Sequence, residues 1–243
     1  YSLNITGNFI NNGTVQNNNY YLYLNISGNI TNNGSWTNYY TTLNGNGNQE
    51  LSMTQPFGCS YLIRNTAAGR LRALTDLSFI GTIINLNDTL EFTSGNSIAL
   101  DGGYIGFGVL YKSATPPLKI TTNNGAYLYS MIVDAPQVEL YGTMLFYSTN
   151  SFKGHIVNYG TLQNSPQNSY TLNITGNFIN NGTVQNNVYF LYLNISGNLA
   201  NNGVWTNYST ALNGPGDQEM SMTQPFAGSN LIRYSAAGRV KAI

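Results

Sequence analysis

The sequence predicts a parallel β-solenoid, a rod in which the chain winds through successive turns of short strands. Two repeats predict this fold. Residues 1–74 recur as residues 170–243 at a constant offset of 169, and 19 of the 74 aligned positions differ. Within residues 1–74, a shorter pattern recurs after 21 residues. Internal repeats with periods of about 20 to 50 residues are typical of solenoids, propellers and arrays.

The shorter pattern has the features of strands that are separated by tight turns. It runs from Leu3 to Val15 and again from Leu24 to Trp36, as L-x-I-x-G-N-x-x-N-N-G-x followed by an apolar residue. Leu and Ile alternate with Asn, Thr and Ser, and alternation with a period of two indicates a strand. Gly-Asn and Asn-Asn-Gly tolerate the positive φ of tight turns. Strand, turn, strand and turn in about 20 residues make one turn of a solenoid.

A β-hairpin is the competing interpretation, because Asn-Gly between alternating strands is also a strong hairpin signal. The recurrence of the whole pattern after 21 residues favours the solenoid, and tandem β-sandwiches remain the alternative. In a solenoid, Asn11 would stack on Asn32 and Asn12 on Asn33. Their side-chain amides would then bond from turn to turn at the strand spacing of about 4.8 Å.

The later turns are less regular, but the same alternation continues, and no apolar pattern with the helical period of 3.6 residues persists. Pro116-Pro117 and residues 164–169 are expected to be loops. After residue 36, strands are expected, in order, around residues 43–53, 62–64, 71–74, 77–83, 90–92, 98–103, 118–120, 138–142 and 156–162.

The expected organisation is one continuous solenoid of about 12 turns. Residues 1–74 form the first copy, 75–169 the part of the period that is not duplicated, and 170–243 the second copy. Because the second copy stops within a period, we expect the chain to be a window on a longer array. The residues expected to point inward are Leu3, Ile5, Leu24, Ile26, Leu172, Ile174, Leu193 and Ile195.

Alignment of the two copies predicts where two kinds of residue lie in the turn. Asn46 aligns with Pro215, so Asn46 should lie at a corner where no ladder hydrogen bond is donated. Trp36 and Trp205 align with apolar Val15 and Val184 of the preceding turn and should point inward.

The composition limits the partners of the chain. Asp, Glu, Lys and Arg make up 7% of the residues, against about 25% in ordinary domains. The nine acidic and nine basic residues cancel, so nothing attracts nucleic acid or an anionic membrane. No apolar run reaches the length of a membrane span. The hydrophobic fraction of 42% argues against disorder, and a neutral surface favours self-association.

The residues that could carry chemistry are few and scattered. Asp88, Glu91 and Asp101 are the nearest approach to a set of catalytic carboxylates, but they are expected to be solvated. His155 is the single histidine and Cys59 the single cysteine, so a transition-metal site lacks ligands. We therefore predict no catalytic, cofactor-binding or metal-binding residue, no cofactor, and no enzymatic activity.

Two groups of side chains are candidates for contacts with a partner. Alternation places four aromatic residues on the outside at equivalent positions of the two copies, as lateral contacts or, less favoured, as a platform for stacking sugars. A basic group also recurs, which would form a solvated or inter-subunit ladder, or bind an acidic glycan or partner. The aromatic residues are Tyr21, Tyr23, Phe190 and Tyr192, and the basic residues are Arg64, Arg70, Arg72, Arg233, Arg239 and Lys241.

Longer motifs support a resemblance to a known class of proteins. L-x-I-T-G-N-F-I-N-N-G-T-V, L-N-G-N-G-N-Q-E-L-S-M, L-I-R-N-T-A-A-G-R-L-R-A-L and L-x-F-x-G-T-I-x-x-L-N-D-T-L-E-F-T-S-G occur in order. They resemble the repeats of large secreted, cell-surface adhesin-type proteins of Bacteroidota and related bacteria. The resemblance implies a right-handed β-solenoid and an extracellular location, and supplies no catalytic motif.

The expected function is therefore structural. We expect the chain to form the shaft of an extracellular filament, sheath, surface layer or adhesin that assembles with itself. Glycans are a second candidate partner. The alternative is a β-helix that binds or cleaves carbohydrate, with its site in residues 75–169.

Overall fold

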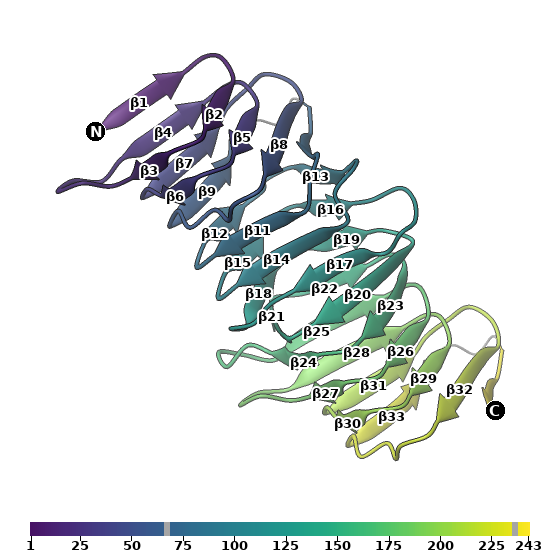
Figure 1. The fold of residues 1–243 in the computed structure, drawn as a ribbon. Helices are drawn as coiled ribbons and strands as arrows, with labels where there is room; N and C mark the ends of the chain where they lie inside the picture. Colours follow the sequence, from purple (N-terminus) through teal and green to yellow (C-terminus); the bar gives the residue numbers. More distant parts are fainter. Residues whose placement is uncertain (66–68, 235–237) are drawn as a thin grey trace.

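The computed structural model describes residues 1–65, 69–234 and 238–243. In these residues all regular secondary structure is β and the strands pair in parallel, so that about 11 turns stack into a rod with three faces (Figure 1). The β-solenoid is confirmed. The Thr-Ala-Ala and Ser-Ala-Ala segments of the repeat, 66–68 and 235–237, lie outside the described residues.

Three stacks of strands form the three faces. The first face contains β1 (Ser2–Ile5), β4 (Tyr23–Ile26), β7 (Tyr40–Leu43), β9 (Tyr61–Arg64), β12 (Ile83–Asn85), β15 (Tyr104–Gly106), β18 (Ala126–Tyr129), β21 (Thr143–Tyr147), β24 (Thr161–Asn164), β27 (Thr183–Gln185) and β30 (Val204–Thr206). The second face contains β2 (Phe9–Asn11), β5 (Ile30–Asn32), β8 (Gln49–Met53), β10 (Leu71–Ala73), β13 (Thr89–Phe92), β16 (Val109–Tyr111), β19 (Ile132–Asp134), β22 (Asn150–Phe152), β25 (Tyr170–Ile174), β28 (Leu191–Ile195), β31 (Ser209–Leu212) and β33 (Asn230–Arg233).

The third face is made of two sheets. A bridge between Phe57 and Phe79 and a hydrogen bond of 2.8 Å from Gly58 N to Trp36 O connect them. The smaller sheet pairs β3 (Thr14–Gln16) with β6 (Ser35–Thr37). The larger one contains β11 (Leu77–Ile80), β14 (Ser97–Asp101), β17 (Leu118–Thr121), β20 (Gln137–Tyr141), β23 (His155–Asn158), β26 (Phe178–Asn180), β29 (Leu199–Asn201), β32 (Gln218–Met222) and β34 (Val240–Ala242).

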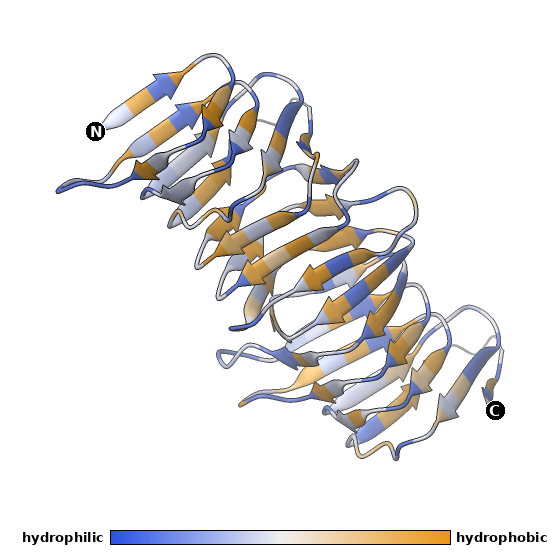
Figure 2. Ribbon diagram, in the orientation of Figure 1, coloured by the Kyte–Doolittle hydropathy of each residue, from blue (hydrophilic) through white to orange (hydrophobic). Residues whose placement is uncertain are grey.

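The core is a column of apolar side chains that runs along the rod. Alternate residues of each strand point into it, which Figure 2 shows as alternating hydrophobic and hydrophilic bands. Six of the eight residues predicted to point inward are buried. Leu3 and Ile5 pair in register with Leu24 and Ile26, but Leu3 is half exposed because β1 has a neighbouring strand on one side only.

Tryptophan fills the core at equivalent places in the two copies. Trp36 and Trp205 are both buried, as predicted. Trp36 packs between Phe9 and Phe57, with ring centroids 5.4 and 4.5 Å away. Its indole N–H donates to Asn38 Oδ1 at 2.8 Å, which satisfies the polar end of the ring inside the core.

Asparagine ladders line the corners that follow the Asn-Asn-Gly motif. Asn11 Nδ2 donates to Asn32 Oδ1 at 2.8 Å, and Asn33 Nδ2 donates to Asn12 Oδ1 at 2.9 Å, so the predicted stacking is confirmed. The corresponding buried ladder later in the chain has three members, Asn158, Asn180 and Asn201, joined by bonds of 2.8 Å. Each ladder therefore ties neighbouring turns together, the Asn12–Asn33 pair at the surface and the others inside the rod.

The glycine of the same motif is required by the closeness of the turns. A Cβ atom on Gly203 would lie 2.0 Å from the carbonyl oxygen of Gly182 in the preceding turn. Real Cβ atoms do not approach an oxygen so closely, so a larger residue would push the turns apart. The Asn-Asn-Gly corner thus combines a buried amide ladder with backbones in direct contact.

The second copy does not lie on the same faces as the first. β1 belongs to the first face, but its counterpart β25 belongs to the second, and the counterpart of β2 is β26 on the third face. Along the first face, β24 lies eight turns after β1, and β25 is the next strand. The period of 169 residues therefore spans eight turns and one further face.

Asn46 lies where the comparison of copies placed it. It is exposed in the bend between β7 and β8, outside the strand ladders, and Pro215 occupies the equivalent bend between β31 and β32. Proline is tolerated there because no ladder hydrogen bond has to be donated.

Candidate interaction surface

Each copy contains a corner that an asparagine side chain shapes. In the first copy, Asn17 Oδ1 accepts hydrogen bonds of 2.9 Å from the amides of Leu22 and Tyr39. This bridge ties the loop before β4 to the next turn of the rod. In the second copy, Asn186 Oδ1 makes the same two contacts, at the same distance, with the amides of Leu191 and Tyr208.

These corners carry stacked aromatic rings on their outer side. Tyr21 stacks on Tyr39 with ring centroids 4.1 Å apart, and Phe190 stacks on Tyr208 at 4.2 Å. We call each group an aromatic corner. The first is Tyr20, Tyr21, Tyr23 and Tyr39, and the second is Val188, Tyr189, Phe190, Tyr192 and Tyr208.

The four aromatic residues that the sequence placed on the outside do lie there. Tyr21 is 58% and Phe190 43% exposed, Tyr23 is exposed, and Tyr192 is half-buried. Tyr23 and Tyr192 lie edge-on to Tyr39 and Tyr208, at 5.8 and 5.6 Å. The two corners therefore present the same arrangement of rings. Their role as lateral contacts stays a prediction.

A column of tyrosines continues from the first corner along the outer side of the first face. The strand register places Tyr23, Tyr40 and Tyr61 next to one another, and then, after Ile83, Tyr104 and Tyr127. Burial, followed by the neighbouring tyrosines, raises the pKa of Tyr39 above its ordinary value. Sequence reasoning missed this column because its spacing varies from turn to turn, so that only the pairing register reveals it.

The predicted basic residues of the first copy do not form one row. Arg72 lies on the second face between Glu50 and Glu91 in the strand register. Glu91 pairs with Arg70 at 3.2 Å and with Arg72 at 3.3 Å, while Asp134 and Lys153 pair further along at 3.0 Å. Basic side chains on the second face therefore lie among acidic ones, and they form no concentrated positive patch for an acidic ligand.

The basic residues of the second copy also lie beside acids or carbonyl groups. Lys241 pairs with Asp217 at 2.9 Å, and Asp217 Oδ1 accepts a hydrogen bond of 2.7 Å from the amide of Arg239. The Lys241 hydrogen bond, then this amide, lowers the pKa of Asp217. Arg233 contacts Gln218 Oε1 and donates to the carbonyl oxygen of Gly216 at 2.9 Å.

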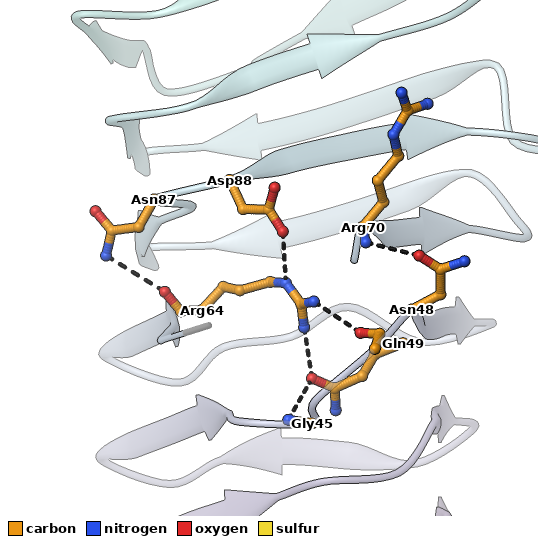
Figure 3. Close-up of polar contacts among 8 residues, drawn as sticks. Gly45, Asn48, Gln49, Arg64, Arg70, Asn87 and Asp88 are labelled. Carbon is orange, nitrogen blue, oxygen red and sulfur yellow. Dashed lines mark hydrogen bonds and ion pairs between the residues drawn. The ribbon is translucent and has the colours of Figure 1, made fainter. Parts of the chain in front are cut away.

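Arg64 belongs to the interior of the rod (Figure 3). Its side chain is 1% exposed, and its guanidinium donates to Asp88 Oδ2 at 3.1 Å, Gln49 Oε1 at 2.6 Å and Gly47 O at 3.0 Å. Gln49 in turn donates to the carbonyl oxygens of Ile26 and Gly28. Arg64 thus connects turns within the rod, which is a structural contact rather than a surface for a ligand.

The three carboxylates considered for catalysis lie apart. Asp88 pairs with Arg64, and Glu91 pairs with Arg70 and Arg72. Asp101 ends β14 on the third face and accepts hydrogen bonds from the amides of Asn123 and Asn124. Each has a structural partner, so the fold does not bring them into one site.

The described residues contain no group of three or more His, Cys, Asp or Glu side chains that could hold a metal ion. His155 Nδ1 accepts a hydrogen bond of 2.9 Å from the amide of Asn177, which is a turn-to-turn contact. In the Asp-Gly-Gly turn at 101–103, Gly102 N donates to Gly125 O at 2.9 Å, and the Asp101 side chain accepts from two amides of the next turn.

A groove of about 540 Å³ lies beside the buried Trp36. A second groove lies at the equivalent place beside Trp205. Both grooves are lined by uncharged residues. In both, the lining includes the Gln-Pro bend, where regular strand pairing is interrupted. The shared positions are Gly34, Ser35, Thr37, Gln55, Pro56 and Gly58 in the first groove and Gly203, Val204, Thr206, Gln224, Pro225 and Ala227 in the second.

Cys59 is expected to be unreactive in the folded protein. Its side chain is buried, and burial raises the pKa of the thiol to about 12. Since the thiolate is the reactive form, a fraction on the order of 10⁻⁴ would be ionised at pH 8. Titration with a chromogenic disulfide at pH 8 should detect no thiol in native protein and one per chain after denaturation. Rapid modification of native protein would contradict this.

No helix in the described part of the chain is long and apolar enough to cross a membrane. Comparison of the chain with protein families, with characterised protein sequences and with solved structures finds no match. The function therefore has to be argued from the geometry of the surface.

Proposed function

We propose that this chain is a structural protein, the shaft of an extracellular filament, sheath, surface layer or adhesin, which assembles with itself through its aromatic corners. The observation that carries the proposal is the recurrence of one exposed aromatic stack, Tyr21 on Tyr39 and Phe190 on Tyr208, with nearly the same geometry. Exposed aromatic groups of this kind mark contact surfaces.

The interior supports a structural role. Buried amide ladders and aromatic contacts connect each turn to the next, so the stability of the rod comes from neighbouring turns. The candidate carboxylates are used in the same way, as partners of arginines and turn amides. A rod of this kind suits a spacer or fibre, and the neutral surface suits association.

Glycan binding is the second candidate function, because exposed Tyr20 and Tyr21 rings are also suited to stacking on sugars. The two functions can be distinguished by whether soluble oligosaccharides bind to the aromatic corners. Soluble oligosaccharides should leave a self-assembly contact unchanged, whereas they should bind to isolated rods if the corners recognise glycans.

The double substitution Tyr21→Asp with Phe190→Asp should strongly weaken assembly while leaving the rod folded. Both side chains lie outside the core, and each aspartate would place a charge in an apolar contact. We expect the circular dichroism spectrum to be unchanged and association to weaken by at least about a hundredfold in sedimentation velocity, since both contacts are lost. A wild-type chain that stays monomeric at high concentration, or that cleaves a polysaccharide, would refute the proposal.

A further inference from the structure

The two aromatic corners lie on different faces of the rod, yet on the same side of it. The first follows β3 on the third face, and the second follows β27 on the first face. In Figure 1, the loop between β3 and β4 and the loop between β27 and β28 both project to the left of the rod. An offset of one face alone would have turned the second corner away from the first.

The twist of the sheets explains why the two corners lie on the same side of the rod although they follow different faces. Near the N-terminus, β3 and β6 of the third face run along the lower left edge of the rod, whereas near the C-terminus β27 and β30 of the first face occupy that edge (Figure 1). β2 and β5 of the second face lie at the upper right, where β26 and β29 of the third face lie later. Strands in a sheet rotate steadily relative to one another, so over eight turns each face moves about one position around the axis.

We propose that the extra strand in each 169-residue period compensates for this twist, so that the two aromatic corners form one straight row along one side of the rod, and that a second copy of this chain binds along that row. This inference rests on the proposed function. If the period were eight whole turns, the twist would place successive corners on different sides of the rod.

Charge favours a second copy as the occupant. The residues of both corners are uncharged, and the ion pairs that Arg70 and Arg72 make with Glu91 lie at the second face. A partner that recognises charge gains nothing from the row, whereas an identical uncharged row brings no like charge against it.

The spacing of the two corners and the shape of the surface beside them also favour a second copy of this chain as the occupant. A second copy carries corners at the same separation, so both contacts can form at once without distortion of either rod. The grooves beside Trp36 and Trp205 border β6 and β30, which share the lower left edge in Figure 1. Each period therefore presents a protruding aromatic corner and an uncharged groove on the side that would face the neighbouring rod.

Two contacts that hold the same neighbour should act together. Once one corner binds, the second binds at a high effective concentration, so the loss of either should be nearly as damaging as the loss of both. The test compares wild type, Tyr21→Asp, Phe190→Asp and the double variant by sedimentation velocity and electron microscopy. We expect rods paired side by side for wild type, and association weakened about a hundredfold by either single change.

Ile10→Asp with Ile179→Asp is the matched control. These residues are another equivalent pair of exposed apolar side chains, outside both corners, and their replacement should leave assembly unchanged. If wild type forms branched assemblies while each single variant forms discrete pairs, the corners face different neighbours, and the single row is wrong although self-assembly stands. If wild type remains monomeric at high concentration, the proposed function itself fails.

Discussion

Replacement of Asn180 by alanine should destabilise the rod by about 3 kcal/mol, because it removes the middle of a buried ladder. The Asn180 side chain makes four hydrogen bonds. It accepts from Asn158 Nδ2 and the amide of Gly182, and it donates to Asn201 Oδ1 and the carbonyl oxygen of Val204. Alanine would leave the Gly182 amide and the Val204 carbonyl without these partners in a partly buried corner, at a cost of about 1–3 kcal/mol for each group.

Asn181→Ala is the control for this substitution, since the two positions are adjacent and chemically identical. Asn181 is exposed, and its side chain accepts one hydrogen bond, of 3.0 Å, from Asn202 Nδ2. We expect a change of less than about 1 kcal/mol. Urea denaturation gives the free energies, and hydrogen exchange should show protection lost first in β26 and β29. Equal effects of the two substitutions would mean that the buried ladder does not stabilise the corner.

Arg64→Met should destabilise the first part of the rod by about 3 kcal/mol. Methionine keeps much of the apolar stem but removes the guanidinium, which bonds Asp88, Gln49 and the carbonyl oxygen of Gly47. Asp88 would then remain as a mostly buried carboxylate without its cation. Breaking a buried pair on one side is costly because the remaining charge is uncompensated.

Arg70→Met provides the comparison for Arg64→Met. Arg70 is 48% exposed and pairs with Glu91 at 3.2 Å, and exposed pairs contribute about 0–1 kcal/mol. The thermal unfolding midpoint should fall clearly for Arg64→Met and little for Arg70→Met. If Arg64→Met is as stable as wild type, the cluster in Figure 3 is not a structural connection between turns.

Much of the fold follows from the sequence, because each turn repeats the same local demands. The offset of 21 residues between Leu3 and Leu24 predicts that turns stack in register, and hence the ladder from Asn11 to Asn32. Alternation within each strand predicts the inward side chains, including Trp36. The exchange of Asn46 for Pro215 predicts a bend outside the ladder. These predictions depend only on neighbours in one turn or the next.

Properties that accumulate over many turns could not be predicted in this way. Irregular turn lengths between the copies conceal that the second copy begins one face later, since an error of a few residues changes the face. The same irregularity conceals the tyrosine column from Tyr23 to Tyr127. Arg64 and Arg70 are close in sequence, but one points into the core and the other into solvent, because strand position rather than sequence distance decides which side a residue occupies.

The displacement of the second copy by one face also bears on how such a sequence could grow. The strands at residues 3–5 and 172–174 are identical, yet they fit two different faces with the same parallel pairing. One strand sequence is therefore accepted by two different faces, since each needs only inward apolar residues and a compact corner. A duplication that begins or ends at any corner would leave the stack intact. The gene could then lengthen by single strands, and selection would be free to choose the increment that keeps exposed groups aligned.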